Sequence, residues 1–189
     1  MSALHVILPT MNFEAFRNSI TSPALQAVAA HWDAARGDQM MPAWQQLRPA
    51  RIAAQLPIIW AYRFNRQTCE FVGRLAGDRI ARHYGKNFRG IRLEALHAPE
   101  VLPAIVANMR RVVEGPALYR CSGKLFRQRD RTGTGERIML PLAGDGVHGD
   151  GLIGASDYEY AMANPDYGPV ELIAEGPCWF ALAPDPVAA

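Results

Sequence analysis

The side chains that could do chemistry do not combine into a catalytic set. Ser156 lies in the run GASDY (154–158), which lacks the second glycine of the G-x-S-x-G nucleophile elbow. No Ser/His/Asp or Cys/His set can be placed by spacing elsewhere in the chain. The sequence therefore favours a protein that is not an enzyme.

Metal-ligating residues are equally scattered. None of the motifs C-x-x-C, H-x-x-x-H or H-E-x-x-H occurs in the chain. Asp145 and Asp150 lie in one short segment, but they lack the spacing of an EF-hand loop and its bidentate glutamate. We expect no metal site.

A glycine-rich run, GDGVHG (144–149), formally matches G-x-G-x-x-G. A dinucleotide site requires a helix directly after this run, because the helix N-terminus receives the pyrophosphate. The residues that follow, DGLIGASDY (150–158), are typical of a strand, and Asp145 and Asp150 would repel a phosphate. The run therefore predicts a hairpin turn.

The elements that position these residues follow from the period of the apolar side chains. Ser22 and Pro23 suit the N-cap and first turn of a helix over 23–36, whose apolar stripe includes Trp32. From Pro57 the period changes from 3.6 to 2, which indicates strands. The further elements expected are strands over 58–64 and 70–76, helices over 77–84 and 101–114, strands over 118–126, 137–143 and 151–158, and turns at 131–135 and 144–150.

This order of elements predicts an α+β fold with an antiparallel sheet, because two strands precede a helical insert and three follow it. The domain is expected over 23–160. Residues 1–22 are interpreted as an arm or strand, and 161–189 as a Pro-rich tail with an apolar anchor at 178–180. The elements do not alternate as βαβ units, so a parallel sheet is not expected.

Composition and charge place the chain among ordinary globular proteins. It has 189 residues, 49% of them hydrophobic, with no apolar stretch of the roughly 18–20 residues that a membrane span needs and no signal peptide. Three widely spaced cysteines favour a reducing cytoplasm.

Residues 1–137 carry a net charge of +10 and residues 138–189 one of −8. This asymmetry favours an acidic part that folds onto the basic part or meets it across a dimer; the alternative is a basic surface for nucleic acid or anionic ligands.

The stretch from Leu56 to Leu96 resembles the front half of a PAS sensor domain: a strand, a turn, a strand ending in Arg-Leu-Ala-Gly (74–77) and a short helix before Gly85. Within that superfamily the chain is similar to the stand-alone alphaproteobacterial PAS-like group. The residues that carry this second likeness are Trp32, Pro42, Pro49, Leu56-Pro57, Phe71, Arg74-Leu75-Ala76-Gly77 and Gly85. The resemblance covers about residues 25–158 and implies five antiparallel strands in the order 2-1-5-4-3, with helices on one face and the N-terminal helix in addition.

The resemblance implies a bacterial signal-sensing or regulatory module that acts through an unidentified signalling protein, with a homodimer formed through the N-terminal helix. Nucleic acid and membrane are not expected as partners.

The flavin-adduct motif of photosensory relatives needs a cysteine where Phe88 stands, which excludes that photochemistry. Haem-binding relatives use an axial histidine, often on the long helix. Here His97 precedes that helix and His83 lies on the short one. Both are therefore interpreted as surface or satisfied residues, and haem is disfavoured. The cofactor, if any, stays unknown.

A ligand site is expected between the sheet and the helices, where a small apolar or aromatic molecule would lie. The candidate lining residues are Trp60, Tyr84, Met109, Tyr119, Cys121 and Met139. The same residues also suit a filled core, which would make the protein a pure interaction adaptor, and the sequence slightly favours that filling. A less favoured third alternative is an enzyme on a PAS- or cystatin-like sheet. Arg74 is interpreted as half of an ion pair that closes the sheet, with recognition of an anionic ligand as the alternative.

Overall fold

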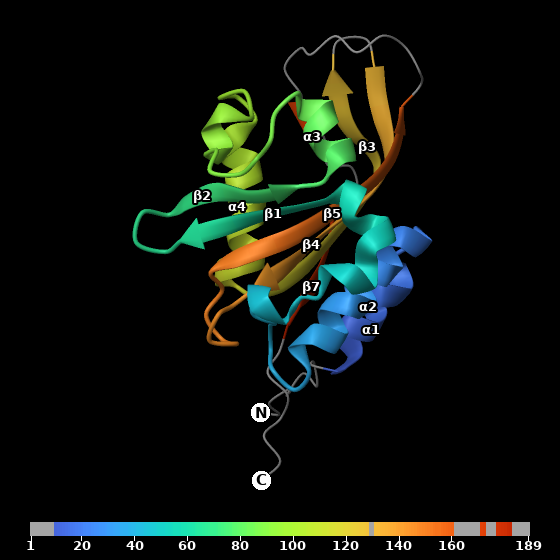
Figure 1. Cartoon of the computed structure of the whole chain (residues 1–189), viewed down its shortest axis with the longest axis vertical. Coiled ribbons are helices and arrows are strands. Elements are labelled where there is room, and N and C mark those ends of the chain that lie inside the picture. The colour runs from blue at the N-terminus through green and yellow to red at the C-terminus, as the bar shows by residue number, and fades with distance from the viewer. Residues whose placement is uncertain (1–9, 129–130, 161–170, 173–176, 183–189) are drawn as a thin grey trace, which may run out of the picture.

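The computed structural model describes residues 10–128, 131–160, 171–172 and 177–182, and Figure 1 shows its elements. Its α-helices are α1 (Thr10–Ser19), α2 (Pro23–Arg36), α3 (Asp78–Tyr84) and α4 (Leu102–Glu114), and its 3₁₀ helices are Trp44–Gln46, Pro49–Ile58 and Leu93–Ala95. Its strands are β1 (Ile59–Asn65), β2 (Glu70–Ala76), β3 (Ala117–Gln128), β4 (Arg131–Leu142), β5 (Gly151–Tyr160), β6 (Glu171–Leu172) and β7 (Cys178–Ala181).

The start of α2 is built as its sequence predicts. The Ser22 hydroxyl accepts a hydrogen bond from the Leu25 N–H at 3.3 Å, and Pro23 occupies the first turn, where its missing N–H costs nothing. Gly37 ends the helix with a φ of +54°. The expectation of an arm or strand before α2 is wrong for residues 10–19, which form α1 and bury Phe13 and Phe16.

The sheet is antiparallel, with the strand order β2-β1-β5-β4-β3-β6 and with β7 also paired to β3. The predicted order 2-1-5-4-3 is therefore confirmed, but the predicted number of five strands is wrong. β6 and β7 add to the outer edge of β3, whose backbone groups would otherwise lack partners along that edge. The apolar anchor expected at 178–180 is β7; the rest of the expected tail, apart from the short β6, lies mostly outside the described residues.

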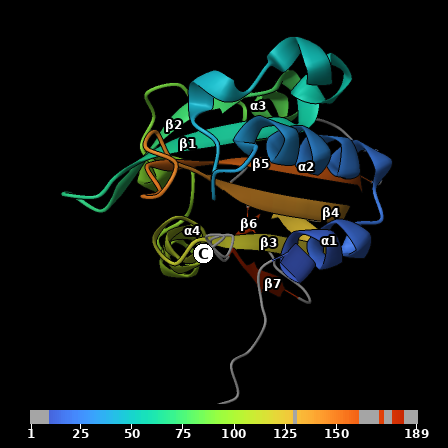
Figure 2. The same cartoon turned by 90° about the horizontal axis from the view of Figure 1, so that it is seen from below.

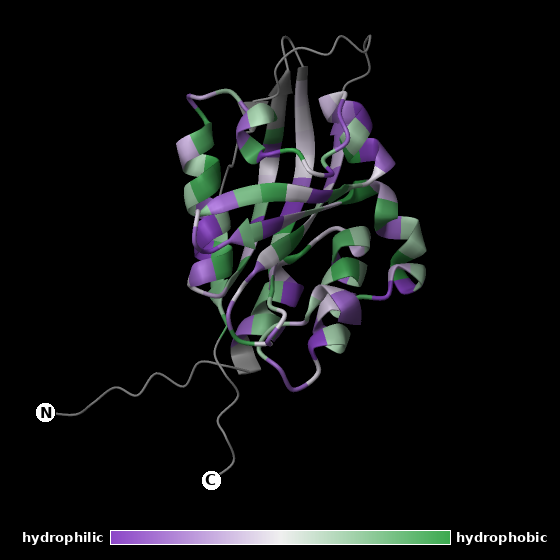
Figure 3. Ribbon diagram, turned by 60° about the vertical axis from the view of Figure 1, so that its left-hand side comes forward, coloured by the Kyte–Doolittle hydropathy of each residue, from purple (hydrophilic) through white to green (hydrophobic). Residues whose placement is uncertain are grey.

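Helices cover both faces of the sheet, so the prediction of helices on one face is incomplete. α4 packs on β3, β4 and β5, whereas α2 packs on β4 and β5 from the opposite side, and Figure 2 shows the strands between these two helices. Side chains of β4 alternate accordingly: Ile138 and Leu140 join the α2 core, and Met139 joins the α4 core. Hydrophobic and hydrophilic residues are both present along the helices in Figure 3, as expected of helices with one buried face.

The α2 core buries the stripe that the sequence predicts. Leu25, Val28 and Trp32 are at most 1% exposed. The indole of Trp32 stacks near Phe13, and its Nε1–H donates to the Pro141 carbonyl at 2.8 Å, so its one polar atom is satisfied within the core.

The two glycine-rich segments of the C-terminal half differ. The run at 144–149 is the β4–β5 hairpin loop, as predicted: Asp145 Oδ1 accepts hydrogen bonds from the N–H groups of Val147 (2.9 Å) and His148 (2.7 Å). The turn expected at 131–135 is wrong, because these residues belong to β4. Gly135 is required there by the close approach of β5, since a side chain would collide with the Asp157 carbonyl.

No helix within the described ranges is long and apolar enough to cross a membrane.

Candidate ligand cavity

A cavity of about 360 Å³ lies between the sheet, α3, α4 and the segment that joins these two helices. Its walls come from β1, α3, the joining segment, α4, β3 and β4. The lining residues are, in chain order, Trp60, Tyr62, Ile80, Tyr84, Phe88, Leu93, His97, Glu100, Val101, Ala104, Ile105, Asn108, Met109, Tyr119, Arg137 and Met139. Pockets of this size and mainly apolar lining are typical of small-molecule sites.

The joining segment is fixed to the edge strand β2 by backbone hydrogen bonds. The Gly73 N–H donates to the Ile91 carbonyl, and the Gly90 N–H donates to the Gly73 carbonyl, both at 2.8 Å. A side chain at position 73 would collide with the backbone of Phe88, so the glycine allows this segment to close one wall of the cavity.

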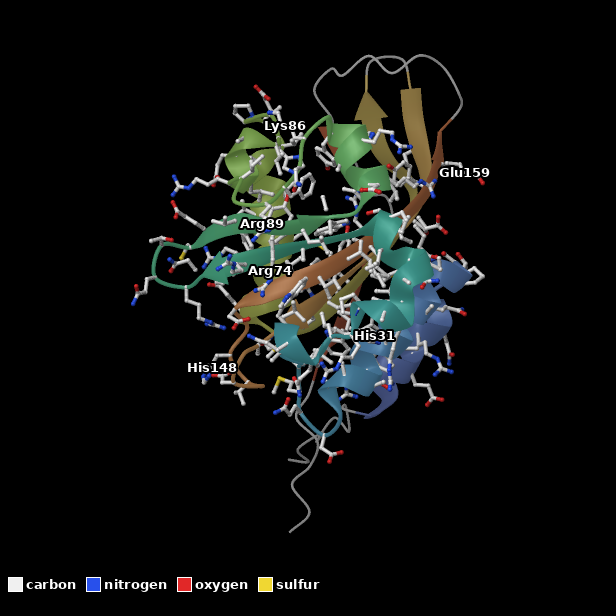
Figure 4. All side chains as sticks on the ribbon, in the orientation of Figure 1. His31, Arg74, Lys86, Arg89, His148 and Glu159 are labelled. Atoms are coloured by element: carbon white, nitrogen blue, oxygen red, sulfur yellow. The ribbon has the colours of Figure 1, made fainter. Side chains whose placement is uncertain are left out.

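Aromatic rings meet at this wall. The Phe88 ring lies 5.6 Å from the Tyr62 ring and 5.0 Å from the Tyr84 ring, the latter edge-to-face. Tyr84 also meets the His97 ring edge-to-face at 5.6 Å. Phe88 itself is 2% exposed, although its neighbours Lys86 and Arg89, labelled in Figure 4, are exposed. These rings pack on one another and give this side of the cavity an aromatic surface.

The floor of the cavity carries a buried arginine. Arg137 on β4 is 7% exposed, and its Nε–H donates to the Ser156 hydroxyl oxygen at 2.9 Å. The same oxygen accepts the Trp60 Nε1–H at 3.0 Å. Ser156, on the neighbouring strand β5, is fully buried and therefore holds two cavity side chains in place. The serine that the nucleophile search singled out has a positioning role.

Burial and the charge of Arg137 act on the pKa values of titratable groups around the cavity. Burial, and secondly the Arg137 charge, lower the pKa of His83 and that of His97 to about 4 each, so both imidazoles are neutral at pH 7. Burial raises the pKa of Tyr84 and that of Tyr62 well above the ordinary value, which keeps both phenols protonated. The cavity thus combines a fixed cation with neutral histidines and tyrosines, while the acidic Glu100 also belongs to its lining.

His97 has a polar atom that the surrounding protein leaves unused. Its Nδ1 is buried and makes no hydrogen bond to any described residue. Both histidines are buried (8% exposed), so the expectation of surface or satisfied residues is wrong for His97. His83 packs against the rings of Tyr84 and Tyr158.

Five of the six candidate residues line the cavity: Trp60, Tyr84, Met109, Tyr119 and Met139. The sixth, Cys121, is fully buried in the same core but does not line the cavity. Its short side chain lies beside Arg137, its cross-strand neighbour, which does reach the cavity. A cavity is thus present where the sequence slightly favoured a filled core, and ligand binding in it stays a prediction.

Sequence reasoning missed Arg137, Tyr62, Phe88, His97 and Asn108 as lining residues. The signal for Arg137 was present, because it alternates with Met139 on β4 and must share its face. Its depth depends on how α3 and the joining segment cover that face, which periodicity does not give.

Arg74 does not belong to the cavity. Its guanidinium lies over the ring of Trp44, 4.2 Å from the centroid, and Figure 4 labels it on the sheet. Arg74 thus makes a cation–π contact and, among the described residues, no ion pair within 4 Å; anion recognition there stays a prediction. Burial, and secondly the charge of Arg63, lower the pKa of Arg74, although the charge of Asp150 acts to raise it.

On the opposite face of β4, Glu136 holds the start of α2. Its carboxylate accepts hydrogen bonds from the Ser22 N–H (2.7 Å), the Thr21 N–H (3.0 Å) and the Arg120 Nε–H (2.6 Å). Burial alone would raise the pKa of Glu136, but these hydrogen bonds outweigh it, and the pKa is lowered. Glu136 and Arg137 are consecutive, so one dipeptide of β4 contacts both the start of α2 and the cavity.

The described residues hold no group of three or more His, Cys, Asp and Glu side chains that could bind a metal ion. What the arrangement can do chemically is bind: it offers an apolar volume, a positioned cation and neutral donors.

One comparison with known proteins gives a match. The family model described as PAS domain matches residues 20–156, which include α2, the sheet from β1 to β5 without the end of β5, and every residue that lines the cavity. A search of curated proteins finds no match to this chain.

Proposed function

The chain belongs to the PAS domain family, whose members are generally sensory and non-catalytic modules, and from that premise we propose that it binds a small aromatic molecule in the cavity and signals through a protein partner. The observation that carries the proposal is the cavity itself. It is bounded by β1, β3, β4, α3, α4 and the joining segment, and its lining is mainly aromatic and aliphatic. A filled core in its place would have favoured the adaptor alternative.

The output of the proposed sensor runs through β4. A ligand on the cavity side contacts Arg137, and the next residue, Glu136, holds the backbone of Thr21 and Ser22 immediately before α2. A small shift of β4 therefore alters the start of α2. We assign the partner-facing surface to α1 and α2 for this reason.

A homodimer through the N-terminal helix stays part of the proposal, with a restriction. The stripe of Leu25, Val28 and Trp32 packs on the sheet of its own chain and is not accessible to a second copy. The contact would therefore use the outer side of α2, where Gln26 and Ala30 are exposed. The output partner and a bacterial setting belong to the proposal on the strength of the family resemblance, and the cytoplasmic setting on that of the three widely spaced cysteines.

A pair of alanines on α4 tests the cavity. Ala104 lines the cavity and is itself exposed, whereas Ala107 is exposed on the same helix and does not line it. Phenylalanine at position 104 should block entry without disturbing the core. We expect Nile red, a neutral fluorescent dye, to bind the wild type and the Ala107→Phe control, and Ala104→Phe to lose most of this uptake at an unchanged melting temperature.

Equal uptake by both variants would show that the dye binds elsewhere and would contradict the assignment of the site. Absence of uptake by the wild type would favour the adaptor.

A further inference from the structure

Arg137 places a permanent positive charge inside a mainly apolar cavity. An arginine side chain keeps its charge in proteins, and moving a charge out of water is costly unless anionic or polar groups compensate. The Ser156 hydroxyl binds Nε, which fixes the plane of the guanidinium and the direction of its terminal nitrogens. A guanidinium held in this way presents parallel N–H donors, the geometry that matches a carboxylate.

The remaining cavity groups favour an anion over a cation at this end. Arg137 lines the cavity at 7% exposure, while Glu100, the acidic lining residue, is exposed at the rim. The neighbouring histidines and tyrosines are neutral, as their shifted pKa values indicate. A cationic ligand would be repelled by the charge of Arg137, whereas an anionic one gains a charge-assisted hydrogen bond.

The same cavity has an aromatic wall. The Phe88 ring contacts the Tyr62 ring at a centroid distance of 5.6 Å and the Tyr84 ring at 5.0 Å. Aromatic side chains at this spacing pack well against a planar ring, edge or face. The buried Nδ1 of His97 lies on the same lining and offers a hydrogen bond to a polar ring substituent.

We propose that the ligand is an aromatic carboxylic acid, with its carboxylate bound by Arg137 and its ring packed against Tyr62, Tyr84 and Phe88. Ser156 and Trp60 act as positioning residues, since they orient Arg137 and do not need to touch the ligand's charge. This inference rests on the proposed function, because it names the class of molecule that the cavity senses.

The test compares an acid with its neutral amide on the unmodified protein. Indole-3-propionate and indole-3-propionamide share ring and side chain and differ at its end, where one carries a charged carboxylate and the other a neutral amide of similar size. Isothermal titration calorimetry gives both dissociation constants. We expect the acid to bind about 10- to 100-fold tighter, as a charge-assisted hydrogen bond implies. Octanoate, an acid without a ring, should bind more weakly than the indole acid.

Two variants test whether Arg137 is the residue that causes the preference for the acid. Arg137→Gln should abolish the preference for the acid, whereas Arg82→Gln, at an exposed arginine on α3 outside the lining, should keep it. If Arg137→Gln fails to fold, the acid–amide comparison on the wild type still decides.

Equal affinity for acid and amide would overturn the inference, and so would octanoate binding as tightly as the indole acid. If Nile red enters while neither indole probe binds, the inference fails and the proposed function stands. If no probe enters, Nile red included, both fail.

Discussion

At the scale of single residues, the cavity depends on one serine. The Ser156 hydroxyl oxygen accepts hydrogen bonds from Trp60 and Arg137, two side chains from neighbouring strands on either side of β5. The residue stands out in the sequence only as a failed nucleophile motif, because its role comes from contacts across the sheet.

Ser156→Ala should destabilise the fold by about 1–3 kcal/mol, because two buried donors lose their common acceptor. Urea denaturation measures this loss. The variant should also weaken indole-3-propionate binding more than indole-3-propionamide binding, since Arg137 loses its orientation. A variant with unchanged stability and unchanged acid preference would contradict the positioning role.

At the scale of elements, Glu136 joins α2 to the sheet by a pH-dependent contact. Its folded-state pKa lies below the ordinary value of 4.5, so the stability it contributes is present above that value and is lost as the pH falls through the lower folded pKa. Glu136→Gln should therefore cost about 1.5–3 kcal/mol at pH 7 and much less near pH 3. Chemical denaturation of both proteins at the two pH values measures the difference. A cost that stays constant with pH would show that charge plays no part in holding α2.

Local patterns predict the elements that carry their own signals. Ser22, Pro23 and Gly37 mark both ends of α2, and the period-two alternation marks β1 to β5, which is enough to identify the antiparallel sheet. α1 was missed because its apolar residues show no clear period in the sequence; its identity comes from packing Phe13 and Phe16 on the core. β7 was missed as a strand because it forms only where the edge of β3 accepts it.

The sequence likewise predicts one part of the candidate site, the residues that lie on strands. Alternation along β1, β3 and β4 gives Trp60, Tyr119 and Met139 their common face. The same alternation assigns Cys121 to this face, but it cannot tell that Arg137 beside it occupies the cavity wall. The joining segment with Phe88 and His97 carries no period at all, so the closed side of the cavity emerges only from the fold.

At the scale of the whole molecule, the sheet separates a cavity side from a side covered by α1 and α2. The expected folding of the acidic part onto the basic part stays a prediction; one described contact of that kind joins Asp157 to Arg79 at 3.5 Å. The acidic side chains at 166, 171, 175 and 185 lie outside the described residues. The two faces meet at Glu136 and Arg137, which is why we place sensing and output on opposite sides of one sheet.

The most direct test of a ligand in the cavity uses the tryptophan indoles as reporters of the two faces. Trp60 lines the cavity, with its Nε1–H bound to Ser156, whereas the Nε1–H of Trp32 is bound to Pro141 on the other face. We predict that titration with indole-3-propionate shifts the Trp60 indole signal in a ¹H–¹⁵N correlation spectrum, to saturation, by more than that of Trp32. A Trp60 signal that stays in place while the acid saturates the protein would contradict the account.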